Sequence, residues 1–501
     1  MPPPDLPLVA RARLHGDRPA IAAPDGSFTY RELLDAAARV AAHLLRGGGD
    51  LAQQRVALLT PAGCAYVAAQ WGIWRAGGVV VPLATSHPPA ELEYTIRDAD
   101  ASVVVVHPEL TTALDRVTLG SSVRRISIAE ATGTAPRSAL PAIEEGRRAM
   151  MVYTSGTTGR SKGVVTSHTN LRSQVTSLVT AWEWRADDAI LLVLPLHHVH
   201  GIVNVLACAL WAGARCTMLP QFDAGQVWSR FVDGDLTLFM AVPTIYRRLI
   251  AAWEAAPPER RRTMTEACGR MRLMVSGSAA LPVQTLERWQ EISGHVLLER
   301  YGMTEIGMAL SNPLRGERRP GFVGTPLPGV EVRLVDDAGR PVAPGTPGEI
   351  EVRGPGVFGE YWRRPEETAA AFRDGWFRTG DVAVVERGAY RILGRRSVDI
   401  IKTGGYKVSA LEIEELLRTH PAIAECAVVG VEDAEWGERI CAAVELRGDA
   451  ELGLDALQRW AGERLAPYKL PRALRCVAAL PRNPMGKVMK PEVAKLFILT
   501  P

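Results

Sequence analysis

The 501-residue sequence predicts an α/β protein with a large N-terminal domain of parallel, helix-covered sheets plus a β subdomain, followed by a small α+β C-terminal domain. Three observations support this. Short apolar strands alternate with helical patterns up to about residue 325, short strands broken by Gly and Pro follow, and a compact strand and helix pattern fills the last hundred or so residues. A chain of this length is also too long for a single core.

The strand and helix rhythm begins near the N-terminus. Residues 28–45 space apolar side chains at helical intervals after Thr29, residues 55–60 form a short apolar run, and a second helix is expected from about Ala65. Further strands, each expected to precede a helix, are predicted at 101–106, 189–196, 236–243, 271–278 and 295–302. In such a sheet, ligands bind at the carboxyl ends of the strands.

The pattern changes twice in the C-terminal half. Residues 329–336, 347–354 and 376–395 predict antiparallel strands. The remaining segment predicts helices at 410–420 and 454–465, strands at 425–431 and 441–446, and a basic tail.

Charge and cysteine usage narrow the class of protein. The 58 Lys and Arg nearly balance the 55 Asp and Glu and are interspersed, which argues against a nucleic-acid groove or a membrane-binding patch. The seven cysteines form no C-x-x-C pair, so neither disulfides nor structural zinc is expected. No apolar leader or bilayer-spanning stretch is evident, and we expect an intracellular, cytoplasmic protein.

The loop "VYTSGTTGRSKGVV" at 152–165 concentrates Gly, Ser and Thr between apolar pairs. Its backbone N–H groups and hydroxyls suit a polyanion such as a triphosphate, with Lys162 as a point charge. The glycine spacing does not fit a Walker P-loop. An ordinary surface loop is the alternative interpretation.

This loop and four further motifs follow one another in a familiar order. They are "ERYGMTE" at 299–305, "WFRTGD" at 376–381, "ILGRRSVDIIKTGGYKVS" at 392–409 and "PRNPMGKVMK" at 481–490. Together they resemble the adenylate-forming acyl-CoA synthetase superfamily over nearly the whole chain. Segments 194–204, 240–249 and 272–282 look most like malonyl-CoA and methylmalonyl-CoA synthetases of the animal mitochondrial type.

The resemblance implies a two-step reaction. A carboxylate attacks the α-phosphorus of ATP to give an acyl-adenylate and pyrophosphate, and the CoA thiol then displaces AMP. It also implies an adenylation domain at 1–396 and a mobile C-terminal domain at 397–501. ATP, CoA and Mg²⁺ are the expected substrates and cofactor, with malonate or methylmalonate as the acid.

The resemblance assigns the phosphate site. Thr304 would bind the α-phosphate and Glu305 would hold Mg²⁺, which favours hard oxygen ligands. The β- and γ-phosphates would be cradled by Thr154, Ser155, Gly156, Thr157, Thr158, Gly159 and Lys162. The alternative for Thr304 and Glu305 is a cap on a helix beginning at residue 306.

The nucleoside site is also assigned by resemblance. Tyr301 would stack on adenine, and the backbone around Ser278 and Ala279 would line the base. Asp381 would accept the ribose hydroxyls, and Arg395 would lie at the ribose and the domain boundary. Taken alone, an Asp after Gly is a common turn residue and an Arg beside Gly is usually a solvated charge.

Lys487 is the expected catalytic lysine of adenylation, bridging the acyl carboxylate and the α-phosphate. Without its motif, it would be part of a solvated basic tail. The resemblance implies that the small domain rotates between the two steps, withdrawing Lys487 and bringing Gly404 and Gly405 to the pantetheine arm of CoA. Ser397 stands at the hinge, where relatives often carry Asp or Lys.

The choice of acid depends on charge. The second carboxylate of a dicarboxylic acid is costly to bury unless a cation receives it, and Arg300, beside Tyr301, is the candidate. His200 and, more weakly, Ser276 are expected donors to that carboxylate, and His198 is the expected gate between the acyl and CoA tunnels. A metal site at His198 and His200, sharing one face of a strand, is disfavoured because no local Asp, Glu or Cys completes it. Arg248 is a further basic candidate or a surface residue.

Two other classes stay open. One is an adenylating enzyme that loads a carrier protein or activates another acid, although no phosphopantetheine motif of the type G-x-D-S-[LI] occurs in the C-terminal region. The other is a nucleotide-binding protein that has lost its chemistry. Small-molecule substrates are the expected partners, with no nucleic acid, membrane or carrier domain. The mitochondrial matrix is the alternative compartment.

Overall fold

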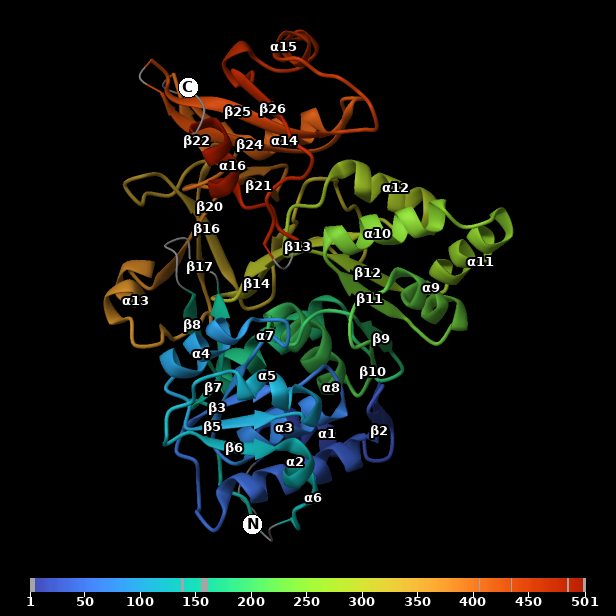
Figure 1. Cartoon of the computed structure of the whole chain (residues 1–501), viewed down its shortest axis with the longest axis vertical. Coiled ribbons are helices and arrows are strands. Elements are labelled where there is room, and N and C mark those ends of the chain that lie inside the picture. Colours follow the sequence, from blue (N-terminus) through green and yellow to red (C-terminus); the bar gives the residue numbers. More distant parts are fainter. Residues whose placement is uncertain are drawn as a thin grey trace. The chain divides into compact units, whose positions relative to one another are not determined.

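The computed structural model describes residues 5–136, 139–154, 161–404, 406–433, 435–483 and 486–498 (Figure 1). It divides into two compact units. The first comprises Met1–Arg318, Gly324–Glu331 and Val352–Phe377, and the second comprises Arg319–Val323, Val332–Glu351 and Arg378–Pro501. The predicted domain boundary after residue 396 stays a prediction.

A seven-stranded sheet of the first unit carries the predicted strand at 55–60. Its order is β18 (Glu360–Tyr361), β8 (Lys162–Ser167), β7 (Arg148–Thr154), β4 (Val79–Pro82), β3 (Arg55–Leu59), β5 (Val103–Val106) and β6 (Arg124–Ser127). The strands from β7 to β6 are parallel, and β8 and β18 add antiparallel pairs at one edge. Their Val-rich runs are buried, as expected for a sheet covered on both faces.

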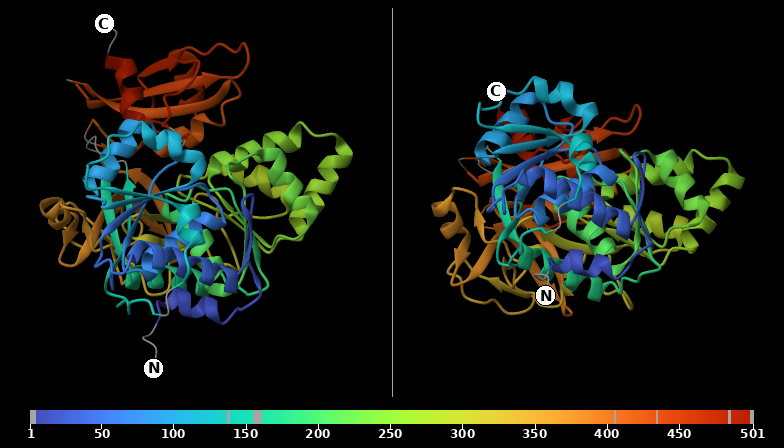
Figure 2. Two further views of the ribbon diagram at one scale, coloured as in Figure 1. Left: turned by 60° about the horizontal axis from the view of Figure 1, so that its bottom comes forward. Right: turned by 90° about the horizontal axis from the view of Figure 1, so that it is seen from below.

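Helices cover this sheet. They are α2 (Tyr30–Leu45), α3 (Cys64–Arg75), α4 (Pro89–Asp98), α5 (Thr111–Asp115) and α6 (Ile128–Gly133), with a short 3₁₀ turn at Pro108–Leu110. Figure 2 shows blue and cyan helices on either side of the light-blue strands. Thr29 starts α2 with a capping box, its hydroxyl accepting the N–H of Glu32, which explains why the predicted helix begins there.

A nine-stranded sheet forms the rest of the first unit's framework. Its order is β15 (Thr325–Pro326), β14 (Gly307–Ser311), β13 (Leu298–Met303), β12 (Leu273–Ser276), β11 (Leu238–Ala241), β9 (Ala189–Leu192), β10 (Arg215–Met218), β1 (Pro19–Ala23) and β2 (Gly26–Thr29). The predicted strands at 189–196, 236–243, 271–278 and 295–302 are confirmed, and they pair in parallel. The helices of this part are α1 (Pro7–Arg13), α7 (His168–Ala181), α8 (Cys208–Ala212), α9 (Ala224–Asp233), α10 (Pro243–Glu254), α11 (Pro258–Gly269) and α12 (Val283–Ser293).

The expected helix after β13 is wrong. The chain turns at residues 304–306 and returns as β14, antiparallel to β13. Gly302 and Gly307 permit this reversal, since a Cβ at Gly302 would lie 2.1 Å from the carbonyl oxygen of Gly307, and Gly307 has a φ of +62°. Thr304 and Glu305 therefore form a hairpin turn and do not cap a helix.

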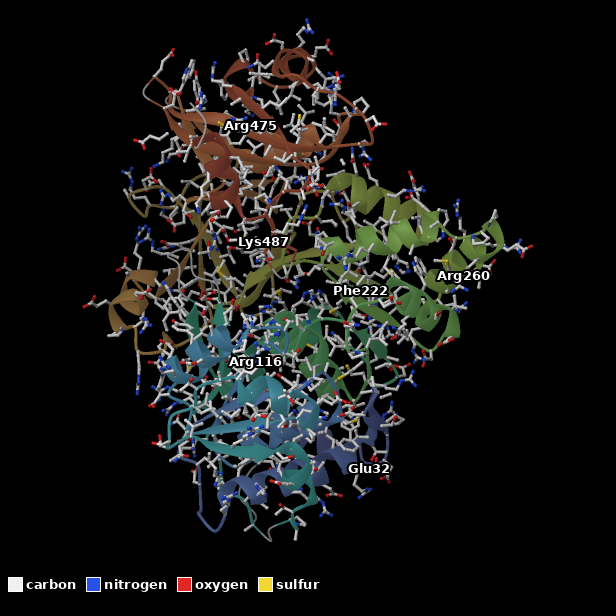
Figure 3. All side chains as sticks on the ribbon, in the orientation of Figure 1. Glu32, Arg116, Phe222, Arg260, Arg475 and Lys487 are labelled. Carbon is white, nitrogen blue, oxygen red and sulfur yellow. The ribbon has the colours of Figure 1, made fainter. Side chains whose placement is uncertain are left out.

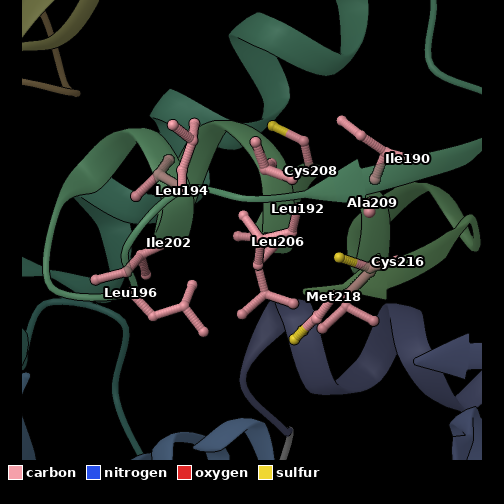
Figure 4. Close-up of a cluster of buried hydrophobic side chains, with 14 of the residues drawn as sticks. Ile190, Leu192, Leu194, Leu196, Ile202, Leu206, Cys208, Ala209, Cys216 and Met218 are labelled. Atoms are coloured by element: carbon pink, nitrogen blue, oxygen red, sulfur yellow. The ribbon is translucent and has the colours of Figure 1, made fainter. Parts of the chain in front are cut away.

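A π-helix, η2 (His200–Ala207), follows β9. Ile202 and Leu206 of η2 pack in the buried cluster that also holds Ile190 and Leu192 of β9 (Figure 4). Further members of the cluster come from α8 and β10. π-Helical turns are rare in proteins, and those that occur are often found at functional sites. The buried cluster around η2 fixes the position of His200 at the start of this helix.

Most residues of the predicted antiparallel strands lie in the second unit. These strands are β16 (Glu331–Val335), β17 (Gly348–Arg353), β20 (Trp376–Glu386) and β21 (Ala389–Arg395). In the first unit, α13 (Pro365–Ala371) and β19 (Phe372–Arg373) precede β20. Pairing of β20 with β21 places Asp381 opposite Arg395.

The C-terminal part of the second unit has the predicted α+β pattern. Strands β22 (Ile400–Thr403), β23 (Tyr406–Ser409), β24 (Ile423–Asp433), β25 (Gly437–Leu446) and β26 (Ala473–Cys476) form one sheet, with α14 (Ala410–Leu417), α15 (Leu454–Gly462) and a 3₁₀ turn at Pro467–Lys469. The expected basic tail also contains helix α16 (Lys490–Ile498), because Val493 and Phe497 bury one of its faces. Among the described helices, none is long and apolar enough to cross a membrane.

Candidate active site

Arg300 lies in β13 with 2% of its surface exposed, next to two residues from other elements. Its Nη2 donates to Oγ of Ser278 over 3.3 Å, and the same Oγ lies 3.1 Å from Nδ1 of His200. Ser276, fully buried at the end of β12, precedes this loop. Three predicted acid-site residues therefore come from neighbouring strands and from η2.

This cluster holds a buried positive charge. Within the described residues, no carboxylate pairs with Arg300, and burial lowers its pKa to about 9. Nε of Arg300, Oγ of Ser276 and Nε2 of His200 are buried without a hydrogen-bond partner in that part of the chain. An unpaired buried charge and unsatisfied donors are costly, so the cluster fits a small anionic ligand.

His200 is held neutral. Burial, and secondly the charge of Arg300, lower its pKa well below the usual value for histidine. A neutral imidazole carries one N–H donor and one acceptor nitrogen. It therefore adds hydrogen-bonding capacity beside Arg300 without a second charge.

Gly277 is a residue that the sequence reasoning missed. A Cβ at this position would lie 2.6 Å from Cζ and Nε of Arg300. Only a residue without a side chain leaves room for the guanidinium here. The signal was present in "VSGSAALP", but the partner of Gly277 is distant in sequence.

His198 lies in a bend between β9 and η2, so the expectation that it shares a strand face with His200 is wrong. Leu196 and His197 form a turn, and η2 begins at His200, two residues after His198. The His197 and His198 rings lie 4.2 Å apart, and burial lowers the pKa of His198 to about 4. In the described ranges, no group of three or more His, Cys, Asp or Glu is arranged to hold a metal ion.

The predicted phosphate loop connects β7 and β8, whose pairing places Thr154 opposite Lys162. Ser155, Gly156, Thr157, Thr158 and Gly159 lie outside the described residues. Nζ of Lys162 forms an ion pair with Glu367 of α13 and lies 5.2 Å from the ring centroid of Tyr361. The ammonium is thus held by groups on the segment from β18 to α13.

Thr304 and Glu305 occupy the turn between β13 and β14, and both are half-buried. The hydroxyl of Tyr361 donates to Oε1 of Glu305 over 3.0 Å, and Phe358 N–H donates to the Glu305 carbonyl over 2.7 Å. Tyr361 therefore touches both Glu305 and Lys162.

The predicted adenine-site residues lie in the first unit, as do Glu305 and Lys162. Tyr301 is half-buried in β13, and Ser278 and Ala279 are exposed after β12. Ser278 has a φ of +69°, a left-handed conformation that is uncommon outside glycine. This conformation accompanies the contact of its side chain with Arg300 and His200, which the sequence reasoning did not anticipate.

In the second unit, Nε of Arg395 donates to Oδ1 of Asp381 over 3.0 Å. Gly404 has a φ of +55° in the turn between β22 and β23, and Gly405 lies outside the described residues. Lys487, labelled in Figure 3, is exposed, and its N–H donates to Oδ1 of Asn483 over 2.9 Å.

Tyr361 and Glu367 are also functional candidates that sequence reasoning missed. Tyr361 is 56 residues from Glu305 in the chain. Its place depends on the pairing of β18 with β8, where Tyr361 lies opposite Val164. No local motif indicates this pairing.

The comparisons with known proteins cover nearly the whole chain. The sequence is 48% identical to the mitochondrial malonate–CoA ligase ACSF3 of Homo sapiens, over 98% of this chain and 92% of the relative. It is 40% identical to a malonate–CoA ligase of Arabidopsis thaliana, over 96% of this chain and 86% of the relative. The structure resembles ATP-bound MatB from Rhodopseudomonas palustris with a TM-score of 0.91 and 36% identity, covering 99% of both chains.

Family profiles match both parts of the sequence. The profile described as AMP-binding enzyme matches residues 8–362, and that of the AMP-binding enzyme C-terminal domain matches residues 412–487. These matches agree with the mixed α/β architecture and with the order of the motifs. The chain therefore belongs to the AMP-binding enzyme family.

Proposed function

We propose that the chain is a malonate–CoA ligase, which activates malonate with ATP as malonyl-adenylate and then transfers the malonyl group to CoA. The observation that carries this proposal is the buried guanidinium of Arg300, which no described carboxylate neutralises. The near-complete matches to proteins named malonate–CoA ligase support it.

In this proposal the acid site separates the two carboxylates of malonate. Arg300 pairs with the carboxylate that does not react. Nε2 of His200 and Oγ of Ser276, which have no hydrogen-bond partner among the described residues, supply further hydrogen bonds. A monocarboxylic acid would leave the guanidinium buried and unpaired, which disfavours its binding. Methylmalonate carries the same two carboxylates and is the expected second substrate.

Adenylation brings anions together and builds negative charge on the phosphoryl oxygens. Lys162 and the loop that begins at Thr154 would bind the β- and γ-phosphates, and Thr304 would donate to the α-phosphate. Lys487 would contact both the reacting carboxylate and the α-phosphate. Preorganised donors and cations of this kind stabilise the transition state more than the ground state.

Mg²⁺ is the expected cofactor, and Glu305 would hold it together with phosphate oxygens of ATP. A single carboxylate plus phosphate and water oxygens is a donor set that Mg²⁺ accepts, and the hydrogen bond from Tyr361 orients the Glu305 carboxylate. When bound, the ion neutralises charge on the phosphates and supports the departure of pyrophosphate.

The nucleoside would stack on Tyr301 beside Ser278 and Ala279, and its ribose would bind Asp381 and Arg395. We also propose that residues 1–396 and 397–501 act as two domains. Rotation of the second would withdraw Lys487 and bring Gly404 and Gly405 to the pantetheine arm of CoA, with His198 at the junction of the two tunnels.

The cellular compartment of the chain is a separate question. The vertebrate relatives carry the word mitochondrial in their names. Cytoplasm stays our prediction for this chain, with the mitochondrial matrix as the alternative.

The proposed function is tested with purified full-length protein, ATP, CoA and Mg²⁺. Thioester formation is measured with malonate, methylmalonate, succinate, propionate, acetate and benzoate. We expect the highest kcat/KM for malonate or methylmalonate and little activity with acids that have one carboxylate. A preference for a monocarboxylic acid would contradict the proposal.

A further inference from the structure

We infer that Tyr361 is a positioning residue of the phosphate site. It holds the proposed metal-binding carboxylate of Glu305 and the ammonium group of Lys162 in fixed positions relative to each other. The inference rests on the proposed adenylation function and extends the Tyr361–Glu305 contact noted above to Lys162 on the neighbouring strand. It is carried by two contacts of Tyr361, one made by its hydroxyl and one made by the face of its ring.

The first contact is polar. The Tyr361 hydroxyl donates to Oε1 of Glu305 over 3.0 Å. A hydrogen bond to one oxygen fixes the plane of a carboxylate and leaves its other oxygen for a ligand. Such supporting bonds typically change metal affinity by about 10-fold or more when they are lost.

The second contact involves the ring face. Nζ of Lys162 lies 5.2 Å from the ring centroid, within cation–π range. The strand register explains this contact, because Tyr361 pairs with Val164, and Lys162 lies two residues away on the same face of β8. Glu367 of α13 forms an ion pair with the same ammonium group.

The backbone around Tyr361 is anchored on each side. Phe358 N–H donates to the Glu305 carbonyl over 2.7 Å, and Trp362 N–H donates to the Gly163 carbonyl over 2.8 Å. Tyr361 N–H donates to Oγ1 of Thr368 over 3.0 Å. The segment from β18 to α13 thus ties the turn that carries Glu305 to the strand that carries Lys162, and the phenol spans the two.

Two variants separate the contacts. Tyr361→Phe keeps the ring and removes the hydroxyl, whereas Tyr361→Leu removes both. Tyr390→Phe is the matched control, since its hydroxyl bonds the Val332 carbonyl over 3.3 Å in the second unit. Each full-length protein is titrated with Mn²⁺ in the presence of α,β-methylene-ATP, without acid or CoA, and bound metal is measured by electron paramagnetic resonance.

We expect Tyr361→Phe to raise the Kd for Mn²⁺ about 10-fold, with nucleotide affinity at saturating metal nearly unchanged. Tyr361→Leu should weaken the nucleotide as well, and Tyr390→Phe should match the wild type. Malonate-dependent exchange of pyrophosphate into ATP should show a raised KM for Mg²⁺ in Tyr361→Phe and a kcat within about 3-fold.

Wild-type Mn²⁺ affinity in Tyr361→Phe would overturn the inference. If Tyr361→Leu fails to fold, Tyr361→Phe still decides the question. Absence of malonate-dependent exchange in the wild type, with weakened Mn²⁺ binding in Tyr361→Phe, would instead contradict the proposed function and leave the positioning role intact.

Discussion

Gly277 leaves the space that the guanidinium of Arg300 fills: a Cβ at residue 277 would lie 2.6 Å from both Cζ and Nε of Arg300. Arg300 is 2% exposed, and the close packing of protein interiors leaves a displaced side chain little room. The position of the Arg300 guanidinium in the acid site therefore depends on the absence of a methyl group at residue 277, just after β12.

We expect Gly277→Ala to displace the guanidinium and to lower kcat/KM for malonate by about 10- to 100-fold, since a shift of about 1 Å in a binding group has effects of this size. Gly269→Ala is the control, because no heavy atom lies within 4 Å of a Cβ there. Steady-state kinetics with malonate measure the effect. Equal activity of both variants would show that the site adapts to the methyl group.

The ion pair between Lys162 and Glu367 yields a second prediction. In the free enzyme Glu367 forms an ion pair with the Lys162 ammonium group, to which the triphosphate would bind. We expect Glu367→Gln to lower the Kd for ATP about 3-fold, the usual effect of a partly exposed ion pair, as measured by isothermal titration calorimetry without acid. Glu366→Gln makes the same charge change at the exposed neighbouring residue of α13 and should have no effect. A higher Kd in Glu367→Gln would mean that Glu367 holds Lys162 ready for ATP.

Buried histidines make stability depend on pH. Burial lowers the pKa of His168 to about 3, from 6.5 for an exposed histidine. Between these values the unfolded chain binds a proton at this residue that the folded chain does not. The contribution of His168 to stability is therefore lost as the pH falls below about 6.5 and is constant above that pH. His197 and His198, with pKa values of about 3 and 4, act in the same direction.

We expect His168→Gln to reduce the slope of unfolding free energy against pH between 4 and 6 by one proton, or about 1.4 kcal/mol per pH unit. Urea denaturation at a series of pH values measures this slope. His107→Gln, which removes a histidine whose side chain is 20% exposed, is the comparison. An unchanged slope in His168→Gln would mean that His168 is charged in the folded protein.

Much of the fold is predictable because local sequence decides it. Apolar runs such as residues 103–106 and 189–192 become parallel strands, and Thr29 with Glu32 fixes the start of α2. The segment after β13 was not predictable in this way. Its apolar residues suit a helix or a strand, and close contact of Gly302 with the Gly307 backbone selects the hairpin.

The same distinction applies to the site. Arg300 could be predicted as a buried cation from its place beside Tyr301 in a motif. Gly277, Tyr361 and Glu367 could not, because their roles come from contacts between strands and helices far apart in the chain. The π turn of η2, which sets the position of His200, likewise has no local signature.

Lys487 provides a test that separates the two half-reactions. We expect Lys487→Ala to suppress malonate-dependent exchange of pyrophosphate into ATP by about two to three orders of magnitude, the typical effect of removing a transition-state contact. Thioester formation from supplied malonyl-adenylate and CoA should be largely intact. Lys495→Ala, which removes an exposed lysine paired with Glu492, is the control. Equal loss in both half-reactions would contradict a role confined to adenylation.

Arg300 provides the test of the acid. Replacing it with Gln would leave the second carboxylate of malonate buried without a cation, a loss of about 3–5 kcal/mol or roughly two to three orders of magnitude in kcat/KM. Acetate has no second carboxylate, so its low rate should stay flat or rise as the site loses its unpaired charge. Arg248→Gln, at an exposed position of α10, should change neither rate.

The ratio of the rates with malonate and with acetate tests the role of Arg300, because a general loss of folding or of nucleotide binding lowers both rates together. A uniform fall for malonate, propionate and acetate in Arg300→Gln would assign Arg300 to the support of its neighbour Tyr301 and hence of the nucleotide. A selective fall for malonate would instead assign the guanidinium to the second carboxylate, because that carboxylate is the group that malonate has and acetate lacks.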